Sequence, residues 1–180
     1  MPSSMKDSER GTSGARRARE LARLGFCAGL LFVLKAALAP LPNIEAVTLL
    51  VILYTLWFGR GALLILCIFV TLEGTVYGFH LWWIAYLYVW VVLWLAVTLA
   101  GRRERSPFFW AALGGIFGLS FGFLCSFPYL AAGGIHTMLG WWAAGIPFDL
   151  IHGFANFALI LVLFSPLDSL WKRANSSKTK

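Results

Sequence analysis

The sequence predicts an all-α integral membrane protein, a compact bundle of six transmembrane helices with both termini on the cytoplasmic side. Two observations support this fold class. Hydrophobic residues make up 59% of the 180 positions and charged residues only 13%, whereas a soluble domain is about half apolar and a quarter charged. The apolar residues also form long continuous runs, which is typical of transmembrane helices. They do not alternate with polar residues as the strands of a membrane β-barrel do.

Six apolar runs are predicted as helices, and each is followed within a few residues by proline, glycine or a charged residue. They cover about residues 21–38, 44–58, 62–77, 82–99, 108–130 and 138–163. The second run is short for a full crossing of the bilayer. The chain is thereby divided into a disordered cytoplasmic tail rich in Ser, Gly and Arg, a membrane domain, and a basic cytoplasmic tail, at residues 1–17, 18–171 and 172–180.

The positive charges predict the orientation. Of the 15 Lys and Arg residues, all except Lys35 lie in the two tails, at the start of the first helix, at Arg60, or in the loop at residues 102–105. Six crossings place all of these positions on one side, and the other three connections contain no Lys or Arg. Because basic residues are retained in the cytoplasm, both termini are predicted to be cytoplasmic, in a multi-pass protein of the bacterial plasma membrane.

Polar residues within or beside the predicted spans are concentrated toward the outer side. Each charge there is costly and needs a partner or a watery cavity. Asp149, His152 and Asn156 are spaced i, i+3, i+7, so they share one helical face, which is expected to point into the bundle. We therefore predict a pocket that opens outward. Its polar substrate-binding candidates are Lys35, Asn43, Glu45, Glu73, Asp149, His152 and Asn156. The alternative is that these groups only hold helices together, with Lys35 paired to Glu73 or Glu45.

Aromatic residues lie at the same level of the predicted bundle. Some are expected in an interfacial belt, where Trp and Tyr are common. Those at the predicted pocket mouth are candidates for stacking on a flat ring or a cation. They are Trp82, Trp83, Tyr86 and Trp141.

Two further patterns concern partners and chemistry. Gly25 and Gly29 allow another helix to approach closely, either a partner protein or a helix of the same bundle. We find no metal-ligand spacing and no nucleotide-binding loop, and we expect no cofactor. Asp149 and His152 would suit an intramembrane enzyme acting on a lipid-soluble substrate, but no recognisable nucleophile motif accompanies them.

Four stretches together resemble a known family. They are residues 42–50 (PNIEAVTLL), 72–78 (LEGTVYG), 82–87 (WWIAYL) and 144–157 (AGIPFDLIHGFANF). Over about residues 21–170 the chain is similar to the substrate-binding S components of energy-coupling factor (ECF) vitamin transporters. The resemblance implies a six-helix bundle that captures a vitamin or related micronutrient near the outer surface, gated by the loop at residues 39–43. It also implies docking, through the first helix, on a membrane-embedded T subunit that two cytoplasmic ATPases drive. The family often has Ala-x-x-x-Ala there, where this chain has Gly25 and Gly29.

We therefore expect a substrate-capture protein that is not an enzyme and binds no nucleic acid. If Lys35, Glu45, Glu73 and Asp149 all ionise, two negative charges are left over, which favours a neutral or cationic ring compound over an anion. Cobalamin, pyridoxine, thiamine, riboflavin and a queuosine precursor remain open as substrates. An intramembrane enzyme is the first alternative, and a structural subunit without a cavity is the second.

Overall fold

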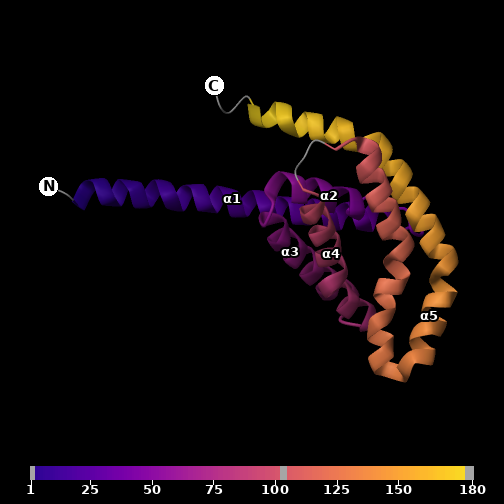
Figure 1. Ribbon diagram of the computed structural model, residues 1–180. Coiled ribbons are helices and arrows are strands. Elements are labelled where there is room, and N and C mark those ends of the chain that lie inside the picture. The colour runs from indigo at the N-terminus through magenta and orange to yellow at the C-terminus, as the bar shows by residue number, and fades with distance from the viewer. Residues whose placement is uncertain (1–2, 102–104, 177–180) are drawn as a thin grey trace.

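The computed structural model describes residues 3–101 and 105–176, with side chains described from residue 14 onward. Over this part of the chain the protein is all-helical, at 90% helix, and contains no strand. The described residues form five helices, labelled in Figure 1, which are α1 (Ser3–Leu38), α2 (Val47–Phe58), α3 (Gly61–Tyr77), α4 (Leu81–Ala100) and α5 (Pro107–Ser176).

Helix α5 consists of two arms. The backbone leaves helical geometry at Gly133, with φ −154° and ψ 16°, and at Gly134, with φ 76°. A positive φ is readily adopted only by glycine, so this pair allows the sharp reversal of the chain seen in Figure 1. The first arm (107–132) and the second arm (135–176) then run back along each other. They correspond to the fifth and sixth helices predicted from the sequence, with the turn at the predicted place.

The helix boundaries differ from the predicted ones mainly at three ends. Helix α2 begins at Val47, three residues after the predicted start, because residues 39–46 form successive turns. Helix α1 extends back to Ser3 through residues for which a disordered tail was predicted. The second arm continues to Ser176, beyond the predicted end of its span. Residues 3–38 contain no proline, the residue that most strongly disrupts a helix, and this is compatible with one continuous helix there.

The helices pack around α2, which contacts α1, α3, α4 and α5. Nine of its 12 residues are buried, so this short helix is enclosed by the others. At about 1.5 Å per residue it is about 18 Å long, well short of the roughly 30 Å hydrocarbon layer. The largest fully buried side chains around it include Phe69, Trp90 and Trp110.

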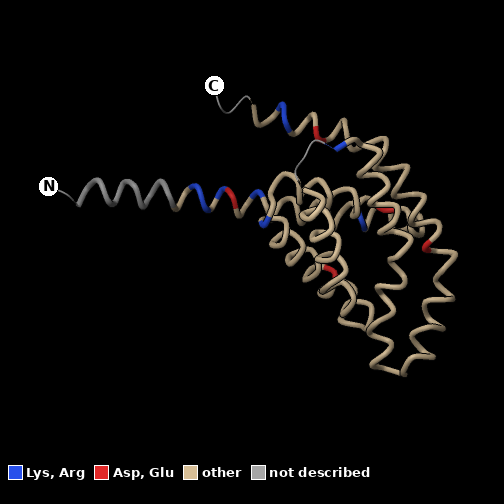
Figure 2. The backbone as a smooth tube through the Cα atoms, in the orientation of Figure 1, with Lys and Arg blue, Asp and Glu red and all other residues tan. Residues whose placement is uncertain are grey.

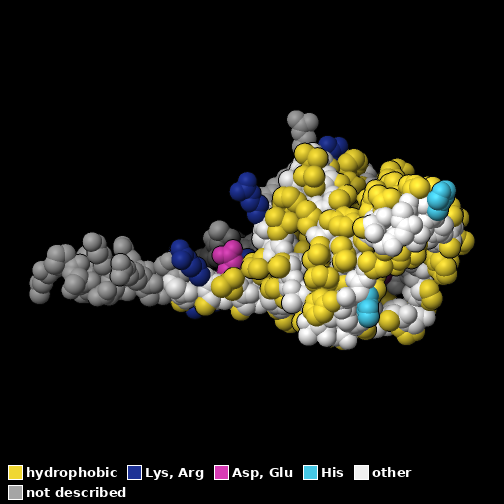
Figure 3. Space-filling view, turned by 90° about the horizontal axis from the view of Figure 1, so that it is seen from below, with side chains coloured by type: hydrophobic (Ala, Val, Ile, Leu, Met, Phe, Trp, Pro, Cys, Tyr) yellow, Lys and Arg dark blue, Asp and Glu magenta, His cyan; other side chains and the backbone are white. Residues whose placement is uncertain are grey.

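The exposed surface around the helix bundle is apolar. Large hydrophobic side chains such as Phe26, Phe154 and Leu99 are more than 70% exposed, and Figure 3 shows hydrophobic groups over most of the visible bundle. In the described residues, three helices are long and apolar enough to cross a membrane, namely Gly14–Leu38, α4 and α5, while α2 and α3 are shorter apolar helices. This is consistent with an all-α membrane protein, because such a surface is unfavourable in water. Six crossings and their orientation remain predictions.

Charged residues and aromatic pairs mark the end of the molecule where both termini lie. Figure 2 shows most of the described Lys and Arg residues near the two chain ends. There, Trp57 of α2 stacks on Trp171 of the second arm, with ring centroids 4.5 Å apart and planes 7° apart. The indole Nε1 of Trp57 also donates to Asp168, at 2.9 Å. These contacts hold the end of the second arm against α2.

Glycines allow the two arms of α5 to approach closely. A Cβ added to Gly118 would lie 2.9 Å from backbone atoms of Gly153, and one added to Gly122 would lie 2.3 Å from the carboxylate of Asp149. Real Cβ atoms essentially never come so close to other heavy atoms. We call Gly115, Gly118, Gly122 and Gly153 the glycine seam. It fixes the second arm, and with it Asp149 and His152, against the first.

Candidate functional site

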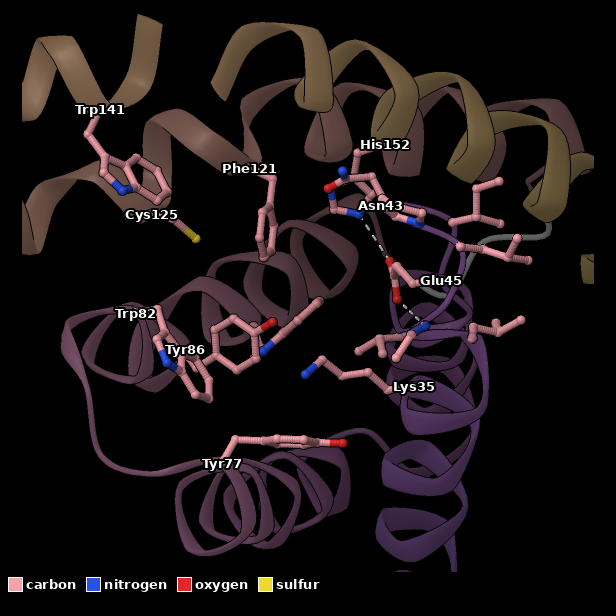
Figure 4. Close-up of a pocket in the computed structure, with 17 residues that line it drawn as sticks. Lys35, Asn43, Glu45, Tyr77, Trp82, Tyr86, Phe121, Cys125, Trp141 and His152 are labelled. Carbon is pink, nitrogen blue, oxygen red and sulfur yellow. Dashed lines mark hydrogen bonds and ion pairs between the residues drawn. The ribbon is translucent and has the colours of Figure 1, made fainter. Parts of the chain in front are cut away.

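A cavity of about 560 Å³ lies where the C-terminal end of α1, the loop at residues 39–46, α4 and both arms of α5 meet. Figure 4 shows its walls. Seven of the eleven predicted substrate-binding residues line this space, although they come from positions 35 to 152. Those that line it are Lys35, Asn43, Glu45, Trp82, Tyr86, Trp141 and His152, and Glu73 lies directly behind Lys35. A second hollow of about 590 Å³, near Trp57, Asp168 and Trp171, contains none of them.

Lys35 forms one side of the cavity. Its ammonium is paired with Glu73 of α3, which is fully buried. The ammonium also lies 5.3 Å from the ring centres of Tyr77 and Tyr86 and 5.9 Å from that of Trp82. A cation within about 6 Å of an aromatic face is attracted to it, so the carboxylate and three rings together stabilise the charge at the cavity wall. The pair Lys35–Glu73 is one of the two pairs expected under the alternative in which these groups only hold helices together.

Glu45 caps α2 and joins the loop to the second arm. Its carboxylate accepts hydrogen bonds from the backbone N–H groups of Val47 and Thr48 in the first turn of α2. It also accepts from the Thr48 hydroxyl and lies 3.2 Å from His152 Nε2. Burial alone would raise the pKa of Glu45, but these contacts with His152 and Thr48 outweigh it and lower the pKa. Glu45 is thus held as a carboxylate, where it also complements the positive end of the helix dipole.

The loop at residues 39–46 closes one side of the cavity with a defined backbone. Three successive turns connect Ala39 to Ala36, Leu41 to Leu38 and Ile44 to Leu41. Asn43 is the only described non-glycine residue with a positive φ, at 60°. Asn adopts this left-handed conformation more readily than most residues. Its side chain lines the cavity and makes no hydrogen bond to any described residue.

The opposite wall is aromatic. Tyr86 meets Trp82 and Phe121 edge to face, with centroids 5.2 and 6.3 Å apart. Phe121 in turn packs edge-on against His152, at 4.8 Å. Trp141 lines the same space and is supported by stacking on Tyr129, at 4.7 Å. Figure 4 shows Trp82, Tyr86 and Phe121 facing Lys35 and Glu45 across the cavity.

Besides Glu73, three predicted substrate-binding residues do not line the cavity and make contacts between helices. Asp149 Oδ1 accepts from the backbone N–H of Gly122, at 2.8 Å. Asn156 donates to the Thr48 hydroxyl, at 3.1 Å. Trp83 donates to the carbonyl of Val70, at 2.8 Å. The ladder Asp149, His152 and Asn156 does face the bundle interior, as expected, but only its middle member reaches the cavity.

Several cavity residues were absent from the predicted set. Phe121, Trp90 and Cys125 line the space from the first arm and α4, and Tyr77 completes the rings around Lys35. Isolated aromatic residues in apolar helices carry no sequence signal that distinguishes them from core residues. The glycine seam was also missed, although the spacing Gly118-x-x-x-Gly122 could have indicated close packing of a helix on the first arm.

The site brings together ligand-binding groups more than catalytic ones. A nucleophile paired with His152 would be needed for the enzyme alternative. Cys125 lines the same cavity, but the hydrogen-bonding partner of His152 is Glu45, and the hydroxyls of Ser120 and Ser126 donate to the backbone carbonyls of Ile116 and Phe123. Among the described residues, no three His, Cys, Asp or Glu side chains lie close enough together to hold a metal ion. The arrangement is suited to binding an organic molecule between an aromatic wall and a polar wall.

A second candidate feature is the face of α1 that carries Gly25 and Gly29. A Cβ added to either glycine would meet nothing within 4 Å. The exposed side chains of Phe26 and Val33 lie nearby on the same helix. These glycines are therefore not used for packing inside the bundle.

No protein-family model, no curated protein and no solved structure matches this chain.

Proposed function

We propose that this protein captures a small organic micronutrient from outside the cell as the S component of an ECF-type importer. The observation that carries the proposal is the cavity between Lys35, Glu45, His152 and the aromatic wall. Its volume of about 560 Å³ lies within the roughly 300–1,000 Å³ range of pockets for small ligands. Lys35, Asn43 and Glu45 belong to the end of α1 and the loop that follows it, which the charge distribution assigns to the outer side, and His152 reaches the cavity from the middle of the second arm.

Three features support capture over the alternatives. A structural subunit would be expected to have a packed interior at this place, whereas a cavity is present. An enzyme would need a nucleophile hydrogen-bonded to His152, whose partner is instead Glu45. The loop at residues 39–46, with Asn43 in a left-handed conformation, is suited to act as the gate that the family resemblance implies.

The open glycine face of α1 supports the second half of the proposal. We infer that Gly25 and Gly29 form the surface that meets the membrane-embedded T subunit. Because neither glycine packs against another helix of the bundle, the close helix approach that small residues permit remains available to a partner. In this arrangement both termini and Arg60 lie on the cytoplasmic side, where the two ATPases act.

Substrate capture is tested by identifying the molecule that co-purifies with the protein. Protein purified from its source membrane in mild detergent is denatured, and the extract is analysed by mass spectrometry. We expect one small molecule at a near-stoichiometric ratio, and no such molecule from the variant Phe121→Asp, which introduces an unpaired charge into the aromatic wall. Arg16→Gln, at an exposed position of α1 far from the cavity, is the control. An empty extract from the wild type, together with no saturable binding of any vitamin, would contradict the proposal.

A further inference from the structure

The hydrogen-bonding inventory of the cavity restricts the chemistry of its ligand. Glu45 has little capacity left. A carboxylate accepts about four hydrogen bonds, and this one already contacts the backbone N–H groups of Val47 and Thr48, the Thr48 hydroxyl and His152. Glu45 therefore positions the loop and His152, and it is a poor partner for a ligand donor.

The groups that remain available are mainly donors, apart from His152 Nδ1, which is buried without a partner and can donate or accept depending on the tautomer. Lys35 has three N–H bonds and one hydrogen-bonded partner, Glu73. The indoles of Trp82 and Trp141 can only donate, and no described residue accepts from either. The Asn43 amide and the Tyr86 hydroxyl can donate or accept, and both are likewise without a hydrogen-bonded partner in the described structure. A ligand that satisfies this wall needs acceptors such as carbonyl oxygens or ring nitrogens.

The charges of the cavity oppose a charged ligand of either sign. Lys35 and Glu73 neutralise each other, and the remaining carboxylate, Glu45, accepts hydrogen bonds from Val47 and Thr48 and contacts His152. An anionic group would face the carboxylates of Glu45 and Glu73, and the ammonium of Lys35 is already paired with one of them. A cationic group would meet a set of rings that already surrounds the ammonium of Lys35, and like charges repel strongly where water is excluded.

The aromatic wall selects for a flat molecule. Tyr86, Phe121 and Trp141 come from three different helical segments and all line the cavity opposite the polar wall (Figure 4). Planar rings pack on such side chains by stacked or edge-to-face contacts. The available space fits a molecule of one to three fused rings and is small for a macrocycle with its substituents.

We propose that the ligand is a neutral, planar heteroaromatic compound rich in hydrogen-bond acceptors, stacked on the wall of α4 and α5 and accepting from Lys35 and Asn43. This inference rests on the proposed function, since it names the substrate class of the same cavity. The sequence favoured neutral or cationic rings because two negative charges were left over. One of these, Asp149, accepts a hydrogen bond from Gly122 outside the cavity, so it does not favour a cationic ligand there.

The test is a binding panel on the full chain in detergent, measured by isothermal titration calorimetry and by quenching of tryptophan fluorescence. Lumichrome and riboflavin represent neutral acceptor-rich rings. Thiamine represents a cationic ring, nicotinate an anionic ring, and biotin an anionic molecule without an aromatic ring. We expect lumichrome or riboflavin to bind at least tenfold more tightly than the other three.

Substitutions of cavity residues test whether the ligand binds in this cavity. Asn43→Ala is expected to weaken binding of the best neutral ring at least about threefold. The pair Lys35→Met with Glu73→Gln, which removes the buried carboxylate together with its partner so that the fold is kept, should weaken it at least about tenfold. Lys172→Met, at the other end of the molecule, is the matched control and should leave the affinity unchanged. Thermal unfolding in detergent checks that each variant is folded.

The outcomes separate the two proposals. Tightest binding of thiamine, nicotinate or biotin, or an affinity for the neutral rings that the Lys35→Met/Glu73→Gln variant does not change, would overturn the substrate class while leaving capture intact. A charged or non-aromatic molecule in the mass-spectrometric extract would do the same. Failure of the whole panel with an empty extract would overturn both.

Discussion

Glycines spaced four residues apart occur in α1, at Gly25 and Gly29, and in the first arm of α5, at Gly118 and Gly122. An added Cβ meets nothing within 4 Å in α1, whereas in α5 it meets the backbone of Gly153 at 2.9 Å or the carboxylate of Asp149 at 2.3 Å. The same spacing thus serves an internal contact in one helix and leaves an open face in the other. In a membrane, where apolar surface gives little driving force between helices, such faces are the natural places for close association.

The largest loss of stability is expected from a substitution at Gly118. In the variant Gly118→Val the new side chain would overlap backbone atoms of the second arm, which cannot rotate away. We expect a loss of about 3 kcal/mol in the free energy of unfolding, as for severe overpacking. Unfolding in SDS, monitored by tryptophan fluorescence, measures it. The matched variant Gly25→Val should stay within about 0.5 kcal/mol of the wild type, and equal losses at both positions would refute the distinction between the two faces.

At Gly122 the obstacle is a side chain, so the effect should depend on that side chain. Gly122→Ala is expected to destabilise by about 2 kcal/mol, because the methyl group displaces the Asp149 carboxylate from its hydrogen bond. Asp149→Ala makes room for the methyl group. The double variant should therefore be less destabilised than the sum of the two single variants, by about 1 kcal/mol in a double-mutant cycle. Strict additivity would show that the contact does not exist.

A smaller effect is expected at Gly153. The atoms nearest an added Cβ belong mainly to the side chain of Leu119, at 2.5 and 2.7 Å, and a flexible side chain can move. Alanine is also favoured over glycine within a helix by up to about 1 kcal/mol. We expect Gly153→Ala to cost about 1 kcal/mol in the same unfolding measurement. A loss as large as that of Gly118→Val would mean that the arms tolerate no movement anywhere along the glycine seam.

Substitutions on the open face of α1 should weaken association with a partner and leave the stability of the fold unchanged. The double variant Gly25→Val/Gly29→Val is expected to keep the stability of the wild type, because both positions are unoccupied. Co-expression with a T subunit and ATPases, followed by affinity purification, should recover much less of the complex than the wild type does. The control is Gly140→Val, another glycine with nothing within 4 Å of an added Cβ. Undiminished assembly of the Gly25→Val/Gly29→Val variant would contradict a docking role for this face.

Much of the site was predictable because charges are expensive in an apolar environment. Lys35, Glu73 and Glu45 had to find partners, and the structure pairs them with each other, with aromatic rings and with the first turn of α2. The roles of Asp149 and Asn156 were not predictable in the same way. Their partners are a backbone N–H of Gly122 and the hydroxyl of Thr48, and neither can be recognised before the distance between helices is known.

Some helix boundaries have a clear local signal in the sequence and others do not. The glycine pair at residues 133 and 134 indicated the reversal of α5 correctly, since φ 76° at Gly134 requires glycine. The start of α2 was placed too early because Glu45 was counted inside the helix, although its carboxylate accepts from the backbone of the first turn. An acidic residue just before an apolar run is a capping signal in its own right. The Ser- and Gly-rich start of α1 gave no comparable indication of a helix.

The stacked indoles of Trp57 and Trp171 have a consequence for spectroscopy. Two nearly parallel chromophores 4.5 Å apart share their electronic excitation, so their transitions split into a coupled pair instead of absorbing independently. The absorption of this pair should therefore differ in shape from that of two separate tryptophans, and the difference should disappear in Trp171→Phe. That difference would report, without any label, whether the last turns of the chain remain attached to α2 while a ligand enters or a neighbouring subunit arrives.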